Sequence, residues 1–175
     1  LYEEITGIDR LNIKGKLISL DLIAADFMNF NNIGLIESAL TGGVTTAGIL
    51  PGSANLVGGI GSVVKTVGSN EVLIRKSCIK VALGENVSKE HEMVRDDLRE
   101  VLFAFFEENR ERIGRMTVRI HCHSREDILL ALELKDRFNL DLILEHLTEG
   151  HLMLDEIRTS GVKVVTGPFF VGRPK

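Results

Sequence analysis

The sequence predicts an α/β fold in which parallel strands are covered by helices. Strand-like and helix-like segments alternate in the last third of the chain. Residues 117–123 and 140–146 are apolar, strand-like runs, and 124–139 between them has the spacing of a helix. A helix over about 148–159 and a strand over 161–168 follow. Because these strands are too apolar to face water, they indicate a parallel sheet buried under helices.

The first part of the chain is more varied. Residues 34–40 are compatible with a short helix, and 42–50 are a β-branched run, opened by glycines and ended by a proline, that predicts a buried strand. The glycine-rich segment 51–62 predicts a loop. Residues 62–77 are compatible with a hairpin that turns at 68–70.

Between these two parts, the sequence predicts one strand and one long helix. Residues 78–85 form an apolar run that contains a single lysine, and 88–112 place apolar residues at helical spacing. Ser88 would cap this helix, with His91 three residues later as a weak partner. No linker and no repeat of fixed period divides the chain, so we expect residues 1–175 to form one domain.

The composition argues against several classes of protein. With 175 residues, 44% hydrophobic and 26% charged, the chain has the make-up of one globular domain. It has no apolar run of roughly 18 residues and no signal-like start, so we expect a soluble, cytoplasmic protein without a membrane partner. A net charge of −4 without a basic stripe argues against a nucleic-acid partner. Cys78 and Cys122 lack a CxxC or CxxH neighbour and should be reduced, buried thiols.

Histidines gather at the predicted carboxyl ends of two strands. One strand ends in His121 and His123, which strand alternation puts on one face, with Cys122 on the other. The next strand ends in His146. In parallel α/β folds, sites form where strands pass into loops, so these imidazoles should converge on one rim of the sheet. Imidazole is a common ligand of zinc-like metals, and the pattern therefore predicts a metal site.

Other polar residues near the predicted strand ends could also take part in the site. Lys80 interrupts the strand at 78–85 and Glu85 ends it, and further candidates are Glu145, Glu149 and His151. Each residue also has a structural explanation. A strand-end histidine is more often a hydrogen-bonded structural residue, Lys80 could extend to water, and Glu85 could form a salt bridge at a loop tip. The coincidence of histidines on neighbouring strands favours the metal interpretation.

The order of these segments resembles the imidazolonepropionase-related amidohydrolases. The resemblance covers roughly residues 38–86 and 117–168 and includes a loop, PGSANL, that is unusual outside that family. The matching segments are ALTGGVTTAGILPGSANLVGGIGSVVKT, CIKVALGEN, VRIHCHSREDILLAL, LDLILEHLTEGH and GVKVVTGP.

The resemblance implies a (β/α)8 TIM-like barrel that carries one or two divalent metals at its carboxyl rim. Zinc is the first expectation, with iron or manganese as alternatives, and the metal-activated water would attack an amide-like or cyclic amide carbon of a small-molecule substrate. His121 resembles a metal ligand, and His146 resembles a second ligand or the residue that polarises the substrate carbonyl. Lys80 is similar to a lysine that is carboxylated and bridges two metals, and Glu85 would take this place in members that use a glutamate. His123 would then support the site.

The chain departs from the family pattern in two places. The opening HxH strand and the aspartate of the last barrel strand are absent, and the sequence begins at Leu1 and ends soon after a strand. We therefore expect an internal, incomplete barrel fragment that is inactive and binds metal weakly or not at all. Its open sheet edges predict self-association into a homo-oligomer. The alternatives are a non-catalytic α/β binding or assembly module and, last, a phosphate-binding barrel, although the glycine-rich loop lacks both GK[ST] and GxGxxG.

Overall fold

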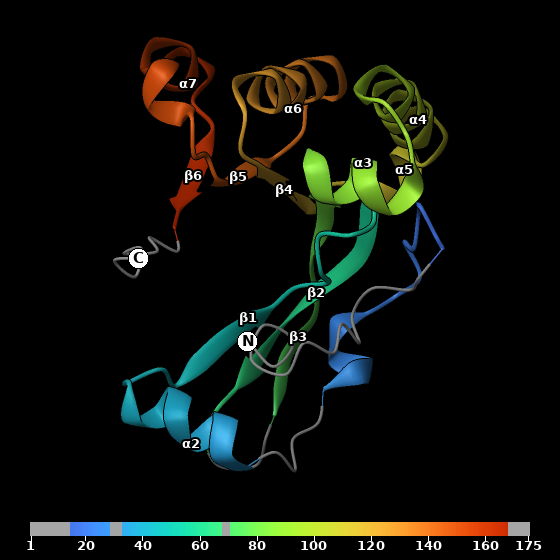
Figure 1. Cartoon of the computed structure of the whole chain (residues 1–175). Helices are drawn as coiled ribbons and strands as arrows, with labels where there is room; N and C mark the ends of the chain where they lie inside the picture. Colours follow the sequence, from blue (N-terminus) through green and yellow to red (C-terminus); the bar gives the residue numbers. More distant parts are fainter. Residues whose placement is uncertain (1–14, 29–32, 68–70, 168–175) are drawn as a thin grey trace.

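The computed structural model describes residues 15–28, 33–67 and 71–167. These residues form a mixed α/β structure around one six-stranded sheet that curls into a half-barrel (Figure 1). The strands lie in chain order and are β1 (Thr46–Ile49), β2 (Val57–Lys65), β3 (Val72–Ala82), β4 (Thr117–Cys122), β5 (Leu142–His146) and β6 (Lys163–Thr166). Strands β3 to β6 are parallel, as the alternating pattern predicts. Strand β2 pairs antiparallel with β3, and β1 pairs antiparallel with β2. The α/β class is confirmed, and the curled sheet is consistent with a partial barrel.

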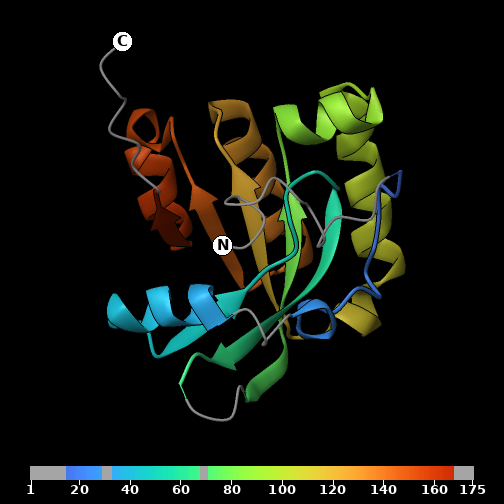
Figure 2. The ribbon, with the colours of Figure 1, turned by 60° about the horizontal axis from the view of Figure 1, so that its bottom comes forward.

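Helices cover the outer side of the parallel strands. Figure 2 shows α4, α6 and α7 side by side along this face, while α2 lies beside β1. The helical segments are η1 (Ala24–Phe27), α2 (Ile33–Thr41), α3 (Glu85–His91), α4 (Arg95–Glu108), α5 (Arg110–Ile113), α6 (Arg125–Phe138), η2 (Gly150–Leu152) and α7 (Leu154–Ser160). Within the described ranges, no helix is long and apolar enough to cross a membrane.

The core lies between the parallel strands and these outer helices. Its largest fully buried side chains include Phe106, Ile120, Ile128, Leu134 and Leu144. Burial of each such side chain contributes about 1.5–3 kcal/mol relative to leaving it exposed. This packing fixes β4 and β5 against α6, so the carboxyl ends of the two strands are held in place.

Helix α6 begins where the sequence predicts it. Ser124 is its N-cap, and the Ser124 side chain and the Asp127 side chain form a reciprocal capping box with each other's backbone N–H. Helix α6 ends at Asn139, which adopts the left-handed conformation with φ 50°. The unit β4–α6–β5 is therefore confirmed by the structure.

The expected buried strand at 42–50 is shorter and more exposed than predicted. Only Thr46–Ile49 form β1, and its residues alternate between exposed and partly buried. β1 pairs with β2 alone among the described strands. An edge strand of this kind does not need both faces to be apolar. The β-branched composition therefore indicated a strand but did not indicate how far its side chains are buried.

The prediction of a loop over 51–62 is wrong in its second half. Residues Val57–Lys65 form β2, whose glycines sit at close backbone approaches and irregular register positions. A Cβ at Gly59, where φ is 129°, would lie 2.6 Å from the Leu22 carbonyl oxygen, and one at Gly61 would lie 2.7 Å from Cys78 Sγ. The glycines therefore make room for neighbouring chain segments rather than marking a loop.

The long helix predicted over 88–112 is divided into three. Ser88 lies inside α3 instead of capping a helix, and α3 ends at Glu92, which has a left-handed backbone with φ 53°. α4 then begins after Val94, and α5 follows it. A left-handed residue cannot continue an α-helix, which explains why the apolar spacing overestimated the length. The predicted helix at 148–159 is likewise divided into η2 and α7.

Candidate functional site

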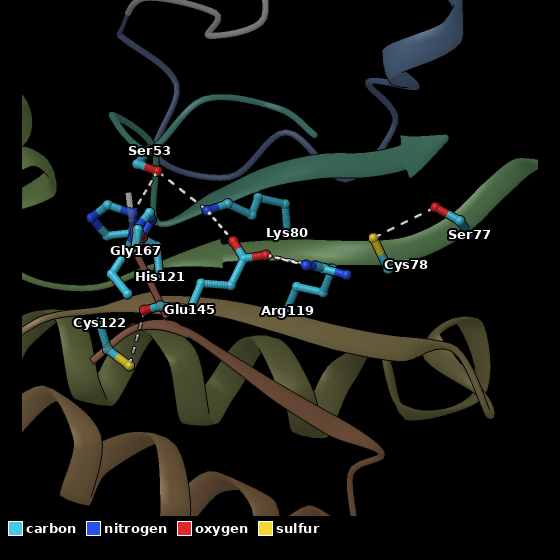
Figure 3. Close-up of polar contacts among 10 residues, drawn as sticks. Ser53, Ser77, Cys78, Lys80, Arg119, His121, Cys122, Glu145 and Gly167 are labelled. Atoms are coloured by element: carbon cyan, nitrogen blue, oxygen red, sulfur yellow. Dashed lines mark hydrogen bonds and ion pairs between the residues drawn. The ribbon is translucent and has the colours of Figure 1, made fainter. Parts of the chain in front are cut away.

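Side chains alternate along β4, and this alternation builds the inner surface of the curled sheet. Val118, Ile120 and Cys122 belong to the core under the helices. Arg119 and His121 point to the opposite, inner face, where Figure 3 shows them near polar groups of other strands. The parallel register places His121 beside Glu145 of β5.

Three imidazoles lie together at the carboxyl ends of β4 and β5. The ring centre of His121 is 4.6 Å from that of His123 and 4.4 Å from that of His146, and the His123 and His146 rings stack at 5.0 Å. His121 is buried, His146 is partly buried and His123 is exposed. The structure therefore brings together the three histidines that the sequence placed on one rim, and we call them the histidine cluster.

Each ring of the histidine cluster is held through its Nδ1 atom. His123 Nδ1 lies 2.7 Å from Thr148 Oγ1, and His121 Nδ1 lies 3.1 Å from Ser53 Oγ. His146 Nδ1 lies 2.6 Å from the backbone oxygen of Gly167. A carbonyl only accepts hydrogen bonds, so His146 carries a proton on Nδ1, and its neutral tautomer has the lone pair on Nε2. Anchoring of one ring nitrogen in this way is typical of histidines that bind a metal through the other.

The backbone turns at His146 to bring its ring to the cluster. Glu145 faces the inner side of the sheet, so strand alternation alone would direct His146 to the outer side. The φ angle of His146 is instead 74°, and that of Leu147 is 46°. Positive φ angles are uncommon for residues other than glycine and concentrate at functional sites.

A buried ion network lies directly beneath the histidine cluster. Lys80 is only 3% exposed, and its Nζ atom lies 3.2 Å from Ser53 Oγ and 3.5 Å from Glu145 Oε2. Arg119 donates a hydrogen bond from Nε to Glu145 Oε1 at 2.7 Å, and its Nη2 atom forms an ion pair with the same oxygen at 2.5 Å. Glu145 thus balances two cations in the interior of the half-barrel (Figure 3).

Burial and neighbouring positive charge favour the neutral forms of His121 and His123. Burial, followed by the charge of Lys80 and the two neighbouring imidazoles, lowers the pKa of His121 from 6.5 to about 3. Burial also lowers the pKa of His123. For Lys80, burial lowers the pKa while Glu145 acts in the opposite direction. Neutral imidazole is the form that binds metals, so the electrostatics suit metal binding.

The remaining predicted residues lie around the cluster, but their ion pairs and hydrogen bonds are with residues outside it. Glu85 is exposed and pairs with Lys89 at 2.6 Å. Glu149 accepts from the backbone N–H of Arg125 at 2.8 Å, and the His151 ring lies 3.2 Å from the Thr148 carbonyl oxygen. A pocket of about 470 Å³ has Glu85, Glu149, His121 and His123 among its lining residues.

The donor set fits a metal only in part. The histidine cluster offers imidazoles with anchored Nδ1 atoms, which is the right chemistry for a zinc-like ion. In the part of the chain that the structure describes, however, no group of three or more His, Cys, Asp or Glu side chains is arranged to hold a metal ion. The described residues therefore supply components of a metal site and not an assembled one.

A comparison with solved structures finds a close likeness in fold. An amidohydrolase from Thermotoga maritima superimposes with a TM-score of 0.85 and 26% sequence identity over 94% of this chain. This likeness supports a general relationship to amidohydrolases. The chain spans 52% of that structure, about half of its length. No protein-family model matches the chain, and no curated protein matches it.

Sequence reasoning missed two residues that contact the site. Arg119 precedes His121 by two residues, so strand alternation could have placed it on the same face. Ser53 contacts His121 across 68 residues of sequence, and no local pattern signals such a contact. Arg119 lies on the inner face of the sheet and Ser53 lies in the loop before β2. The sequence indicated this polar region only through Lys80 and the histidines.

Proposed function

We propose that this chain is part of a metal-dependent amidohydrolase that hydrolyses the C–N bond of an amide or cyclic amide. The observation that carries the proposal is the histidine cluster, whose three Nδ1 atoms are anchored at the carboxyl ends of parallel strands. The likeness to an amidohydrolase structure supports the hydrolase class. The resemblance of the PGSANL and HCH segments to imidazolonepropionase-related enzymes supports an amide or cyclic amide substrate.

His121 and His146 are the residues that would hold the metal. A bound divalent ion, with zinc as the first choice and iron or manganese as alternatives, would supply a Lewis acid that activates water. Because the described residues do not form a complete site, we propose that further ligands come from parts of a longer protein, about twice the length of this chain. The chain alone would then be inactive and would bind metal weakly.

The residues of this chain would orient the reacting groups. The Gly167 carbonyl fixes the His146 ring, which could either bind the metal or polarise the substrate carbonyl. Lys80 could serve as a carboxylated ligand only after its Nζ atom gives up its contacts with Glu145 and Ser53. In the present arrangement Lys80 instead adds positive charge beneath the cluster, which would stabilise an anionic transition state. Glu85 remains the alternative ligand.

Zinc binding tests the proposal. We expect the isolated chain to bind zinc weakly, and we expect His121→Ala and His146→Ala to weaken this binding further. His151→Ala is the matched control because His151 is exposed and bonds outside the cluster. Isothermal titration calorimetry would measure affinity and stoichiometry, with circular dichroism to confirm folding. Tight one-to-one binding by the isolated chain would contradict the incomplete site, and unchanged binding in both cluster variants would contradict the ligand assignment.

Turnover in the longer protein provides the second test. His121→Ala and His146→Ala should leave that protein folded but remove metal and activity on hydantoin-like or imidazolone-like substrates. If the variants lose stability while no metal dependence exists beforehand, the histidines are structural and the hydrolase proposal fails.

A non-catalytic assembly role is the second candidate function. The observation that favours it is β6, whose Val164 and Val165 are 45% and 46% exposed on a strand that pairs with β5 alone in the described sheet. Exposed apolar strand edges favour pairing with another chain. We propose that the chain forms a homo-oligomer, which light scattering would test. A monodisperse monomer for both the wild type and a Val165→Lys variant would contradict this role.

A further inference from the structure

We infer that Ser53 is a positioning residue for His121, holding the ring by Nδ1 so that Nε2 faces the histidine cluster. The metal-ligand role of His121 in this inference rests on the proposed function. Two contacts of the Ser53 hydroxyl carry the inference. Ser53 Oγ lies 3.1 Å from His121 Nδ1 and 3.2 Å from Lys80 Nζ.

The antiparallel pairing of β2 with β3 explains how Ser53 reaches the site. Val57, the first residue of β2, pairs with Val81 near the carboxyl end of β3. The segment that precedes Val57 must therefore lie at the carboxyl edge of the parallel strands, where the histidine cluster is. Figure 3 shows Ser53 above Lys80 and beside His121.

The loop that carries Ser53 is held firmly by its neighbours. Leu56 is fully buried, and its carbonyl accepts from the Ala82 backbone N–H at 3.0 Å. Pro51 is buried as well, and a Cβ at Gly58 would lie 3.0 Å from the Gly52 carbonyl oxygen. A loop packed this tightly presents the hydroxyl from a fixed position, so the hydroxyl can fix the ring.

The directions of the hydrogen bonds follow from the donors available. The Lys80 ammonium only donates, so it donates to Ser53 Oγ and leaves the serine its own proton. That proton can be donated to an unprotonated His121 Nδ1, which places the ring proton on Nε2. Alternatively, the second lone pair of Ser53 Oγ can accept from Nδ1–H, which leaves the Nε2 lone pair available to a ligand.

A hydroxyl therefore serves both tautomers of His121 without movement of any heavy atom. The carbonyl that holds His146 cannot do this, because it accepts only and fixes one tautomer. In the described residues, Ser53 Oγ contacts His121 Nδ1 and Lys80 Nζ. Of these two atoms, Nδ1 of a neutral ring can accept the serine proton, whereas the Lys80 ammonium cannot. The zinc-free chain should thus hold His121 with its proton on Nε2, and zinc binding through Nε2 should move the proton to Nδ1.

Nitrogen NMR of the histidine rings tests the inference in the zinc-free chain. Long-range ¹H–¹⁵N spectra distinguish the two tautomers, and His121→Gln assigns the signal. We expect one tautomer in the wild type, a mixture in Ser53→Ala, and the wild-type pattern in Ser53→Thr, which keeps the hydroxyl. Ser77→Ala is the matched control, because Ser77 lies on the same strand as Lys80 but its hydroxyl donates a hydrogen bond to Cys78 Sγ. A single unchanged tautomer in Ser53→Ala overturns the inference.

Zinc titration separates this inference from the proposed function. We expect Ser53→Ala to weaken zinc binding about 10-fold or more relative to the wild type, with Ser53→Thr close to the wild type. Equal zinc affinity in the alanine variant and the wild type overturns the positioning role. If the wild type binds no zinc but its tautomer still depends on Ser53, the expected weak zinc binding by this chain is contradicted while the hydrogen-bond inference stands. Should Ser53→Ala not fold, Ser53→Cys, a weak hydrogen-bonding group of similar size, must show the same mixture or the inference is overturned.

Discussion

His121 should make the stability of the metal-free chain depend on pH in the mildly acidic range. The pKa of His121 is about 3 in the folded chain and 6.5 for an ordinary histidine, because burial and the nearby Lys80 charge disfavour the imidazolium. The unfolded chain takes up a proton first as the pH falls. The contribution of neutral His121 to stability is therefore complete above pH 6.5 and is lost progressively between pH 6.5 and 3.

The expected size of the effect follows from these two pKa values. At about pH 5 an unfolded histidine is almost fully protonated while folded His121 is still neutral, so the chain loses about 2 kcal/mol of unfolding free energy relative to about pH 7.5. The full difference, reached only near pH 3, is about 5 kcal/mol. Other groups also titrate in this range, and the lowered pKa of His123 acts with the same sign.

A comparison with His121→Gln isolates the contribution of His121. Urea unfolding followed by circular dichroism, at about pH 7.5 and about pH 5, gives the loss of stability for each protein. The wild type should lose about 2 kcal/mol more than His121→Gln on acidification. His151→Gln, a change at an exposed ring, should behave as the wild type. An equal loss in the wild type and His121→Gln would refute the reasoning, because His121 would then titrate as an exposed histidine does.

Two further changes test the surroundings of the cluster. Glu145→Gln leaves buried Lys80 without its carboxylate partner and should lower the unfolding free energy by about 3–5 kcal/mol in urea. Adding Lys80→Met should recover part of this loss, and a single-variant loss below about 1 kcal/mol would contradict the buried pair. Gly61→Ala should cost about 1–3 kcal/mol because its Cβ would lie 2.7 Å from Cys78 Sγ. Gly48→Ala, with no atom within 4 Å of the new Cβ, should cost much less, and equal costs would contradict this account.

The sequence predicted the parallel half of the molecule because its signals there are local. Residues 117–146 contain two apolar strands and a helix with its own capping serine, and each of these features is decided by neighbours along the chain. The same locality placed His121 and His123 on one face, since alternation along a strand fixes side-chain direction. Lys80 could be assigned to the strand, but its partners could not be predicted, because Glu145 and Ser53 are distant in sequence.

His146 shows where local rules stop being sufficient. Alternation from Glu145 directs the His146 side chain outward, yet its ring lies 4.4 Å from that of His121. The left-handed backbone at His146 and Leu147 reverses the direction, and the Leu147 N–H donates to the Cys122 carbonyl at 3.0 Å. The His146 ring forms a hydrogen bond through Nδ1 with the backbone oxygen of Gly167, which follows β6. These contacts come from three separate segments, so a pattern within one strand could not have predicted the turn.

The sequence predicted a strand over 42–50 and a hairpin over 62–77, whose turn at 68–70 lies outside the described residues, but it did not predict that β2 begins at Val57. The site depends on this early start of β2. Had residues 51–62 been a free loop, as their glycines suggested, nothing would fix the position of Ser53. Because the second half of the segment pairs with β3 in reverse direction, the first half is confined to the carboxyl edge of β3 and β4. The glycines that hid the strand from sequence analysis are the residues that allow it to approach Leu22 and Cys78 closely. Replacing them should therefore displace the Ser53 hydroxyl, and with it the His121 ring, before it affects the parallel strands.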